Sequence, residues 1–266
     1  MHLTDALGRE HVFDERPQRI VSLVPSITET LFGLGLDAEV AGVTDFCIHP
    51  GARVRNKPRV GGTKNPMVGR ILSLRPDLVI ANKEENRRCD VERLADRGIR
   101  VFVTHARTVQ DALDELGVLG TIVGCEHAAL TIIREIQGAW ETARMRVQAG
   151  RPLVVALIWK NPYMAVGGDT FANDLLVQSG AANPFQTATH RYPRLSETDL
   201  VTAGPEVILL PTEPYAFGEK ERLELLSLDC PAARDRRIHI VEGEFLTWYG
   251  PRMARAFRLL SDLINP

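Results

Sequence analysis

The sequence lacks a block of charge of either sign. Its 266 residues include 32 Lys and Arg and 34 Asp and Glu, which gives a formal net charge of −2. Proteins that bind nucleic acid or an anionic membrane surface usually gather basic residues on one face or in one run. The balanced and scattered charge therefore predicts neither of these partners.

Long apolar runs are missing as well. No stretch approaches the roughly 20 apolar residues that a membrane-spanning helix needs, so we expect no membrane insertion. Residues 1–19 are polar and charged, without the apolar core or the small-residue cleavage site of a signal peptide. As written, the sequence predicts a cytoplasmic protein. A leader removed ahead of Met1 would instead place it in the periplasm or on the cell surface.

Cysteine is scarce and scattered. The four cysteines are Cys47, Cys89, Cys125 and Cys230, and no two of them form a CxxC pair. This pattern is typical of reduced thiols rather than of a disulfide framework.

The chain also lacks the short motifs of the common enzyme classes. It has no GxSxG nucleophile elbow, no HExxH zinc motif and no GxGxxG dinucleotide-binding turn. GGTKNP is a glycine turn with a lysine, Lys64, but its spacing and the residue after the lysine differ from those of a P-loop. The sequence therefore predicts a binding protein without enzyme activity or a built-in cofactor. A metal-dependent enzyme is the alternative outside the binding proteins.

What the chain does have is an alternation of apolar strands and helices. RIVSLVPS is a predicted strand, and SITETLFGLGL after it is a predicted helix with Ser26 as N-cap and Glu29 completing a capping box. The apolar run LVIA (78–81) is typical of a strand buried on both faces. Residues 87–97 are a predicted helix. Such an alternation predicts a parallel sheet with crossover helices, an α/β fold.

The same order of elements occurs twice. Residues 124–150 contain no proline and predict one long helix between glycines. After it, RPLVVALIWKNP resembles a first strand again, GPEVILLPTEP echoes RPDLVIANKEE, and RRIHIVEGE echoes GIRVFVTHA. We therefore predict two similar α/β lobes with parallel sheets, joined by one long helix. The predicted boundaries are 1–122 for the N-terminal lobe, 123–150 for the linking helix and 151–266 for the C-terminal lobe.

Two lobes joined by one helix place a cleft between them. In open parallel sheets, ligands bind beyond the carboxyl ends of the strands. Glu84 and Glu85 follow a central strand, and Glu213 occupies the matching place in the second lobe. Opposed carboxylates across the cleft are one interpretation. The alternative is a solvated helix start, since acidic residues favour the first turn of a helix.

GVTDFCIHP places a thiol and an imidazole two residues apart. Cys47 and His49 could bind a bare transition metal, with glutamates completing the coordination sphere. The alternative is that Cys47 is a small buried apolar side chain and that His49 hydrogen-bonds within its loop. Both interpretations remain open from the sequence.

Two segments, THRYPR and FLTWYGPR, concentrate aromatic and basic residues. Tyr192, Trp248 and Tyr249 could pack on the face of a flat macrocycle, and Arg191 or Arg252 could pair with its carboxylates. The alternative for the tryptophan and its neighbouring tyrosine is packing between a strand and the last helix. The predicted ligand-binding residues are Ser26, Asp45, Phe46, Cys47, Lys64, Asn82, Glu84, Glu85, Trp159, Tyr163, Arg191, Tyr192, Glu213, Tyr215, Trp248, Tyr249 and Arg252.

The chain resembles a known family in several segments, which follow one another along nearly its whole length. They are RIVSLVPSITETLFGLGL, GVTDFC with its HP, RVGGTKNP, GRILSLRPDLVIA, NPYMAVGGDTFANDLLVQSGAANPF, RYPRLSETDLVTAGPEVILL and WYGPRMARAF. Together they resemble the helical-backbone (class III) substrate-binding proteins of ABC importers, which include cobalamin-binding and ferric-siderophore-binding proteins. The resemblance implies two Rossmann-like lobes bridged by a rigid helix. It also implies that the interlobe cleft holds a metal chelate, a corrinoid first, with haem or a ferric siderophore as alternatives.

The resemblance also implies a partner, an ABC permease. Cobalamin-binding relatives dock on the permease through a glutamate on each lobe, and the aligned positions here are Gly69 and Thr198. Neither carries a carboxylate, which argues against this docking because charge pairs set the register on a partner. Of the positions aligned with corrin-stacking tryptophans, near Thr63, Asn82 and Tyr192, only the last is aromatic.

Overall fold

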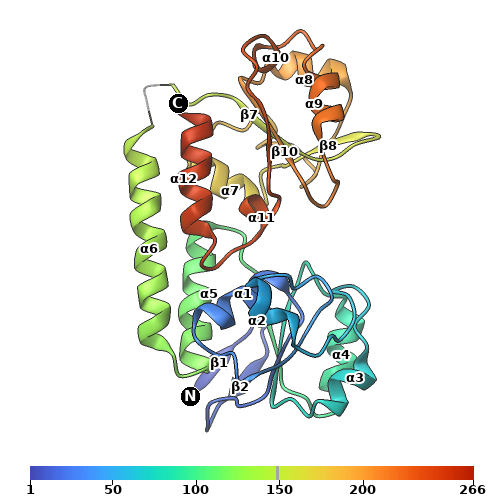
Figure 1. The fold of residues 1–266 in the computed structure, drawn as a ribbon, viewed down its shortest axis with the longest axis vertical. Coiled ribbons are helices and arrows are strands. Elements are labelled where there is room, and N and C mark those ends of the chain that lie inside the picture. Colours follow the sequence, from blue (N-terminus) through green and yellow to red (C-terminus); the bar gives the residue numbers. More distant parts are fainter. Residues whose placement is uncertain (148–149) are drawn as a thin grey trace. The chain divides into compact units, whose positions relative to one another are not determined.

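The structure, a computed structural model, describes residues 1–147 and 150–266 (Figure 1). The described chain divides into two units, and both are discontinuous in sequence. Unit 1 comprises Met1–Ala106, Gln110–Ile133 and Tyr249–Pro251, and unit 2 comprises Arg107–Val109, Arg134–Trp248 and Arg252–Pro266.

Unit 1 is built on a four-stranded parallel sheet with the order β4-β3-β5-β6. Successive side chains of a strand point to opposite faces. Leu78 and Ile80 of β5 accordingly join one apolar cluster, while Val79 and Ala81 join another. The prediction that LVIA is a strand buried on both faces is confirmed. The strands are β3 (Ile20–Ser22), β4 (Val40–Val43), β5 (Leu78–Asn82) and β6 (Val101–Thr104).

Helices cover both faces of this sheet, and a short antiparallel hairpin precedes it. The first apolar cluster includes residues of α1 and α5, and the second includes residues of α3 and α4. The elements are β1 (His2–Thr4), β2 (Glu10–Val12), α1 (Pro25–Gly33), α2 (Gly51–Arg55), α3 (Val68–Ser73), α4 (Arg88–Ala95) and α5 (Val109–Ile122).

The start of α1 differs from the sequence prediction. The N-cap residue is Val24, and Pro25 occupies the first helical turn. The ring of a proline fixes φ near the helical value, and a missing N–H costs nothing where the helix has no acceptor for it. Ser26 therefore lies inside the helix, and the predicted capping box with Glu29 is wrong.

Unit 2 contains a five-stranded sheet with the order β11-β10-β7-β8-β9. Strands β7, β10 and β11 are parallel, whereas β8 and β9 are added antiparallel. In α7, Thr170 is the N-cap, and its side chain accepts a hydrogen bond of 3.1 Å from the Asn173 amide. The strands are β7 (Val154–Trp159), β8 (Tyr163–Ala165), β9 (Arg194–Leu195), β10 (Val207–Pro211) and β11 (Ile238–Val241). The helices are α7 (Phe171–Gln178), α8 (Glu197–Ala203), α9 (Glu219–Leu225), α10 (Pro231–Arg234), α11 (Glu244–Thr247) and α12 (Met253–Ile264).

The repeated order of elements predicted from the sequence is present in the two sheets. The neighbours β3, β5 and β6 of unit 1 have the same parallel order as β7, β10 and β11 of unit 2. The sheets differ beside the first of these strands, where unit 1 has the parallel β4 and unit 2 has the antiparallel β8. The predicted α/β fold with Rossmann-like lobes is confirmed.

The long helix α6 (Glu126–Met145) begins in unit 1 and ends in unit 2. Gly124, with φ of +67°, precedes it, which fits the predicted glycine boundary. The prediction of a helix to residue 150 extends past the observed end, and residues 148–149 lie outside the described part of the chain. None of the described helices is long and apolar enough to cross a membrane.

Candidate functional site

Several loops at the carboxyl end of the unit 1 sheet are tied to one another. The Asn86 side-chain amide donates hydrogen bonds of 2.9 Å to the Thr63 carbonyl and 3.2 Å to the Leu23 carbonyl. The amide of Asp45 donates to the Gly61 carbonyl at 2.9 Å. The loops after β3, β4 and β5 and the glycine turn are therefore held together. The sequence pattern pointed to these loops but did not single out Asn86.

The turn after β5 orders the two predicted glutamates. The Asn82 side-chain oxygen accepts from the amides of Glu84 at 2.8 Å and Glu85 at 3.2 Å. The ammonium group of Lys64 donates to the Glu84 carbonyl, and a ring nitrogen of His105 lies 3.2 Å from the Glu84 carboxylate. Helix α4 begins only at residue 88. The glutamates therefore belong to a fixed turn and not to a helix start, and burial raises the pKa of Glu85.

Tyr249 joins this turn from the far end of the sequence. Its hydroxyl accepts a hydrogen bond of 2.5 Å from the Asn82 side-chain amide, which also donates to the Thr104 carbonyl at 3.0 Å. Burial, followed by the nearby Glu115 and Glu85, raises the pKa of Tyr249 well above its ordinary value. The phenol therefore stays neutral, as a buried hydroxyl next to carboxylates must.

Glu115 is a site residue that the sequence analysis missed. It projects from α5, and its carboxylate accepts a hydrogen bond of 2.5 Å from the His105 amide. Burial, reinforced by the negative charge of Asp111, raises the pKa of Glu115 to about 7. In the sequence, the only signal for Glu115 was its position among the apolar residues of LDELGVL. The amide that its carboxylate binds belongs to the loop after β6, and a helical pattern does not reveal this contact.

Cys47 lies inside unit 1. The side chain is 0 % exposed, and its sulfur is 3.1 Å from each hydroxyl of Thr28 and Thr44. Burial raises the pKa of the thiol, which disfavours the thiolate that binds metals. The described residues hold no group of three His, Cys, Asp or Glu side chains suited to a metal ion. This placement favours the interpretation of Cys47 as a buried packing residue over the metal interpretation with His49.

Other predicted residues of unit 1 differ in exposure. Phe46 is 60 % exposed beside the buried cysteine, and Asp45 is exposed as well. A side-chain carbon at Gly62 would lie 3.2 Å from the Phe46 ring, so the glycine turn lies against that ring. Ser26 is buried within α1.

In unit 2, an exposed tryptophan lies at the end of β7. Trp159 is 43 % exposed, and its ring packs at 5.7 Å, edge to face, with that of Tyr215. The tyrosine ring in turn lies 4.6 Å from that of Phe217. The next residue, Lys160, pairs with carboxylates of α9, at 3.7 Å for Glu221. Two post-strand loops are thus joined, and one flat apolar face is presented to solvent.

The remaining predicted residues of unit 2 form two groups. Arg191 donates to the Asp169 carbonyl at 2.5 Å, and its guanidinium lies 5.8 Å from the ring of Tyr192, which is 36 % exposed. Glu213 is exposed, whereas Tyr163 is buried in the apolar cluster of this unit.

Trp248 and Arg252 are buried together. They are 8 % and 4 % exposed, and the guanidinium lies 5.2 Å from the tryptophan ring centre. The same guanidinium is 3.8 Å from the Glu242 carboxylate and 4.0 Å from that of Glu244. This arrangement favours the packing interpretation of the tryptophan. In the same arrangement the arginine pairs with two carboxylates of its own chain.

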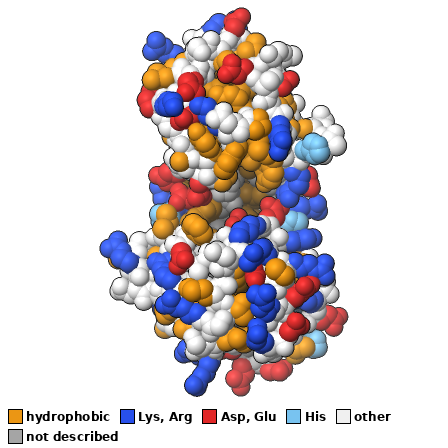
Figure 2. Space-filling view, turned by 90° about the vertical axis from the view of Figure 1, so that its right-hand side faces the viewer, with side chains coloured by type: hydrophobic (Ala, Val, Ile, Leu, Met, Phe, Trp, Pro, Cys, Tyr) orange, Lys and Arg blue, Asp and Glu red, His pale blue; other side chains and the backbone are white. Residues whose placement is uncertain are grey.

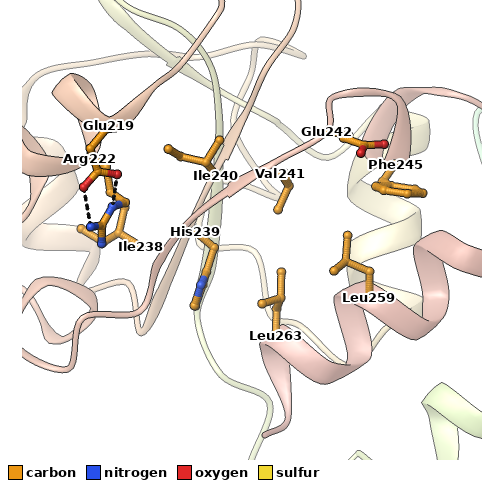
Figure 3. A pocket seen from close by; sticks show the side chains of 10 residues that line it. All are labelled: Glu219, Arg222, Ile238, His239, Ile240, Val241, Glu242, Phe245, Leu259 and Leu263. Atoms are coloured by element: carbon orange, nitrogen blue, oxygen red, sulfur yellow. Dashed lines mark hydrogen bonds and ion pairs between the residues drawn. The ribbon is translucent and has the colours of Figure 1, made fainter.

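The surface has no extended field of one charge on the face that Figure 2 shows, where basic and acidic side chains are interspersed. Gly69 in α3 and Thr198 in α8, which we expect to align with the docking glutamates of the relatives, are both exposed. A pocket of about 540 Å³ lies along β11 and contains none of the predicted ligand-binding residues (Figure 3). The polar network and exposed rings, not this pocket, therefore mark the candidate ligand site.

Comparisons with known proteins agree with the fold. A family model described as periplasmic binding protein matches residues 20–227. The chain is 26 % identical, over 99 % of its length and 85 % of the relative, to the uncharacterised ABC transporter substrate-binding lipoprotein YvrC of Bacillus subtilis. It is 31 % identical to a cobalamin-binding protein of Halobacterium salinarum, over 77 % of this chain and 57 % of the relative. A solved periplasmic heme-binding protein from Pseudomonas aeruginosa matches with a TM-score of 0.81 and 25 % identity, over 94 % of this chain and 93 % of that chain.

Proposed function

Because this chain belongs to the periplasmic binding protein family, we propose that it binds a bulky metal chelate, with a corrinoid as the first candidate. The relatives named for cobalamin and heme binding support this class of ligand. The chelate is the protein's cargo and leaves unchanged, so the residues described above need only bind it. A family composed of binding proteins supports this role over catalysis.

The observation that carries the proposal is the exposed, fixed ring of Trp159. It stands at the carboxyl end of β7, where parallel sheets bind ligands, and Tyr215 holds it edge-on at 5.7 Å. Flat apolar rings supply large contact area to a macrocycle at little cost in side-chain entropy. Phe46, 60 % exposed at the corresponding end of β4, offers unit 1 a similar surface.

The two predicted ligand-binding arginines already contact groups of the same chain, and this favours a corrinoid over haem as the ligand. Haem carries two carboxylates that need cations, whereas the periphery of cobalamin consists largely of neutral amides. Arg252 is buried between two glutamates, and Arg191 is held by Asp169. The carbonyl and carboxylate groups around Glu84 and Glu85 are better suited to accept hydrogen bonds from amides than to face propionates.

A parallel titration with cyanocobalamin and haemin tests the proposal. We expect one-to-one binding of cyanocobalamin, followed by absorbance, tryptophan fluorescence and calorimetry, and weaker binding of haemin. Trp159→Ala should weaken cyanocobalamin binding at least about tenfold, or roughly 1.4 kcal/mol. Trp140→Phe is the matched control, since Trp140 packs against Phe257 and not at a strand end. If no chelate binds while Zn²⁺ binds stoichiometrically, the proposal fails.

We further propose that the protein acts outside the cytoplasmic membrane, but without the charge pairs of the cobalamin-binding relatives. The description of its family as periplasmic binding proteins supports this location. Gly69 is exposed, and a side-chain carbon added there would meet no atom within 4 Å, so Gly69→Glu has room. Thr198→Glu would stand beside Glu197 at the start of α8. We expect the double variant, but not the wild type, to stimulate ATP hydrolysis by a purified cobalamin importer. Equal stimulation by the wild type would contradict this, and fractionation of the native host cells checks the location.

A further inference from the structure

The pocket along β11, called the β11 groove below, lies beside the strand that ends one side of the unit 2 sheet (Figure 3). Its lining includes five consecutive residues, from Ile238 to Glu242. Because side chains alternate between the two faces of a sheet, a groove on one face would be lined by every second residue. Consecutive lining residues therefore mean that the groove faces the strand edge-on.

The backbone of this edge has hydrogen-bonding groups to offer. The carbonyls of Arg237 and Val241 accept hydrogen bonds of 3.0 and 2.9 Å from amides of β10 and the residue after it. In a ladder, alternate residues direct their backbone groups to opposite sides. The N–H and C=O groups of Ile238 and Ile240 are therefore directed to the outer edge. Among residues 1–147 and 150–266, no strand pairs with that edge.

In unit 1, both edges of the sheet are partly covered by other segments of the chain. The Ala6 amide donates to the Val103 carbonyl at 2.9 Å, so the N-terminal segment covers part of β6. On the other side, Arg59 forms a parallel bridge with Val43 of β4. Open edges tend to pair with another chain, and natural proteins usually cover or charge them. The uncovered edge of β11 thus calls for an explanation that the ligand site does not supply.

The edge segment RRIHIVE is self-complementary when read in antiparallel order. Its first residue, Arg236, is basic, its last, Glu242, is acidic, and His239 is the midpoint. Arg236 is exposed and has no ion-pair partner among the described residues. The Glu242 side chain is 59 % exposed, with Arg252 at 3.8 Å as its weak internal partner.

We propose that β11 pairs antiparallel with β11 of a second copy of this chain, around a two-fold axis through His239. In this register Ile238 of one copy faces Ile240 of the other, and the pair exchanges both backbone hydrogen bonds. Arg236 of each copy lies in the turn before the strand, with φ of +56°. Beyond the end of the paired strands it then comes near Glu242 of the partner, and opposite charges favour this approach. Such a contact is isologous and closes at a dimer.

The helices that line the groove are compatible with the same two-fold symmetry. Figure 3 shows Glu219 and Arg222 of α9 and Leu259 and Leu263 of α12 on different sides of β11. A two-fold axis perpendicular to the sheet places each of these helices in one protomer beside the same helix of the other protomer. The two α9 helices, in each of which Glu219 pairs with Arg222 at 2.6 Å, then lie on one side of the joined sheet, and the two α12 helices lie on the other. All these residues belong to unit 2, so the dimer contact is formed within that unit.

Charge-reversal variants, studied alone and mixed with each other, test the proposed register of the two β11 strands. Sedimentation equilibrium of the full chain, at concentrations up to about 1 mM, should show a reversible dimer. Arg236→Glu alone and Glu242→Arg alone should each weaken dimerisation at least about tenfold, because like charges then face each other. An equimolar mixture of the two variants should dimerise again, since each copy supplies the charge that the other needs. Arg194→Glu, the same change at the β9 edge of the same sheet, should have no effect.

A backbone variant keeps the test decisive if a charge variant folds poorly. Ile240→Pro removes an amide that points to the outer edge and leaves the ladder to β10 intact, and proline is tolerated at such edge positions. It should abolish the dimer while circular dichroism and cyanocobalamin binding stay unchanged. A wild type that is monomeric throughout, reversals without effect, or a mixture no stronger than its components would overturn the proposal.

Discussion

The Asn82 side chain donates a hydrogen bond of 2.5 Å to the Tyr249 hydroxyl, although 167 residues separate the two in the sequence. The short segment Tyr249–Pro251 belongs to unit 1, while the residues on both sides of it belong to unit 2. This bond therefore fixes a late segment of the chain to the turn after β5. Since the same turn orders Glu84 and Glu85, the bond connects the fold of unit 1 with its candidate ligand site.

We expect Tyr249→Phe to lower the free energy of unfolding by about 1 kcal/mol, the net contribution of a typical hydrogen bond. The loss stays small because Asn82 retains its bonds to Thr104. Tyr249→Ala should cost about 3 kcal/mol or more, since it also removes the buried ring. Urea denaturation measures both. A Phe variant as stable as the wild type would show that the hydroxyl does not hold the segment.

Thiol reactivity should distinguish buried from exposed cysteines. Cys89 is exposed, whereas Cys47 and Cys230 are buried. Because the thiolate is the reactive form and burial raises the pKa of Cys47, an aromatic disulfide reagent should label Cys89 quickly and Cys47 only after unfolding. Cys89→Ser should remove the fast phase. Fast labelling of Cys47 in the native protein, or its protection by Zn²⁺, would instead support the metal interpretation.

Much of the fold was predictable because it is encoded locally. The run LVIA needs apolar neighbours on both faces, and β5 has them. The repeated strand order followed from similar segments in a similar order. The capping box at Ser26 failed because two local signals competed, and Pro25 in the first turn prevailed.

The candidate site was less predictable because distant segments build it. Phe46 and Trp159 were predicted as ligand residues from their place after strands, and both rings are exposed there. Glu115 was missed, because a helical pattern does not reveal that its carboxylate meets the His105 amide. The pattern also could not decide between a buried and an exposed Cys47, since its two threonine partners come from different elements.

Glu115 should make stability depend on pH. Its pKa is raised from 4.5 to about 7 in the folded protein, chiefly by burial. Between these values the unfolded chain releases the proton and the folded chain keeps it, so the free energy of unfolding falls as pH rises through this window. The full loss, present above pH 7, is on the order of 3 kcal/mol at most.

Glu115→Gln should remove this pH dependence, because the amide oxygen still accepts from His105 but carries no charge. Above pH 7 the variant should be more stable than the wild type in urea denaturation. Asp114→Asn is the control, since Asp114 is exposed on the same helix, and it should leave the profile unchanged. A Glu115→Gln variant whose stability falls with pH as steeply as that of the wild type contradicts the assignment.

Two glycine-to-alanine changes should have opposite effects. Gly250 has φ of +97°, and an added side-chain carbon would lie 2.2 Å from the Thr30 hydroxyl oxygen. Thr30 is buried and donates to the Ser26 carbonyl at 2.9 Å, so it has no room to move. Gly250→Ala should therefore lower the free energy of unfolding by about 2 kcal/mol or more.

Gly138, exposed within α6, meets no atom within 4 Å of an added side-chain carbon. Gly138→Ala should raise the free energy of unfolding by about 0.5–1 kcal/mol, because alanine loses less backbone entropy in a helix. The added atom is the same in both variants, so the sign of the difference depends on backbone conformation and space alone. If Gly250→Ala were neutral, Tyr249–Pro251 would not be held against α1 in solution, and the bond from Asn82 to Tyr249 would have to be made by a mobile segment.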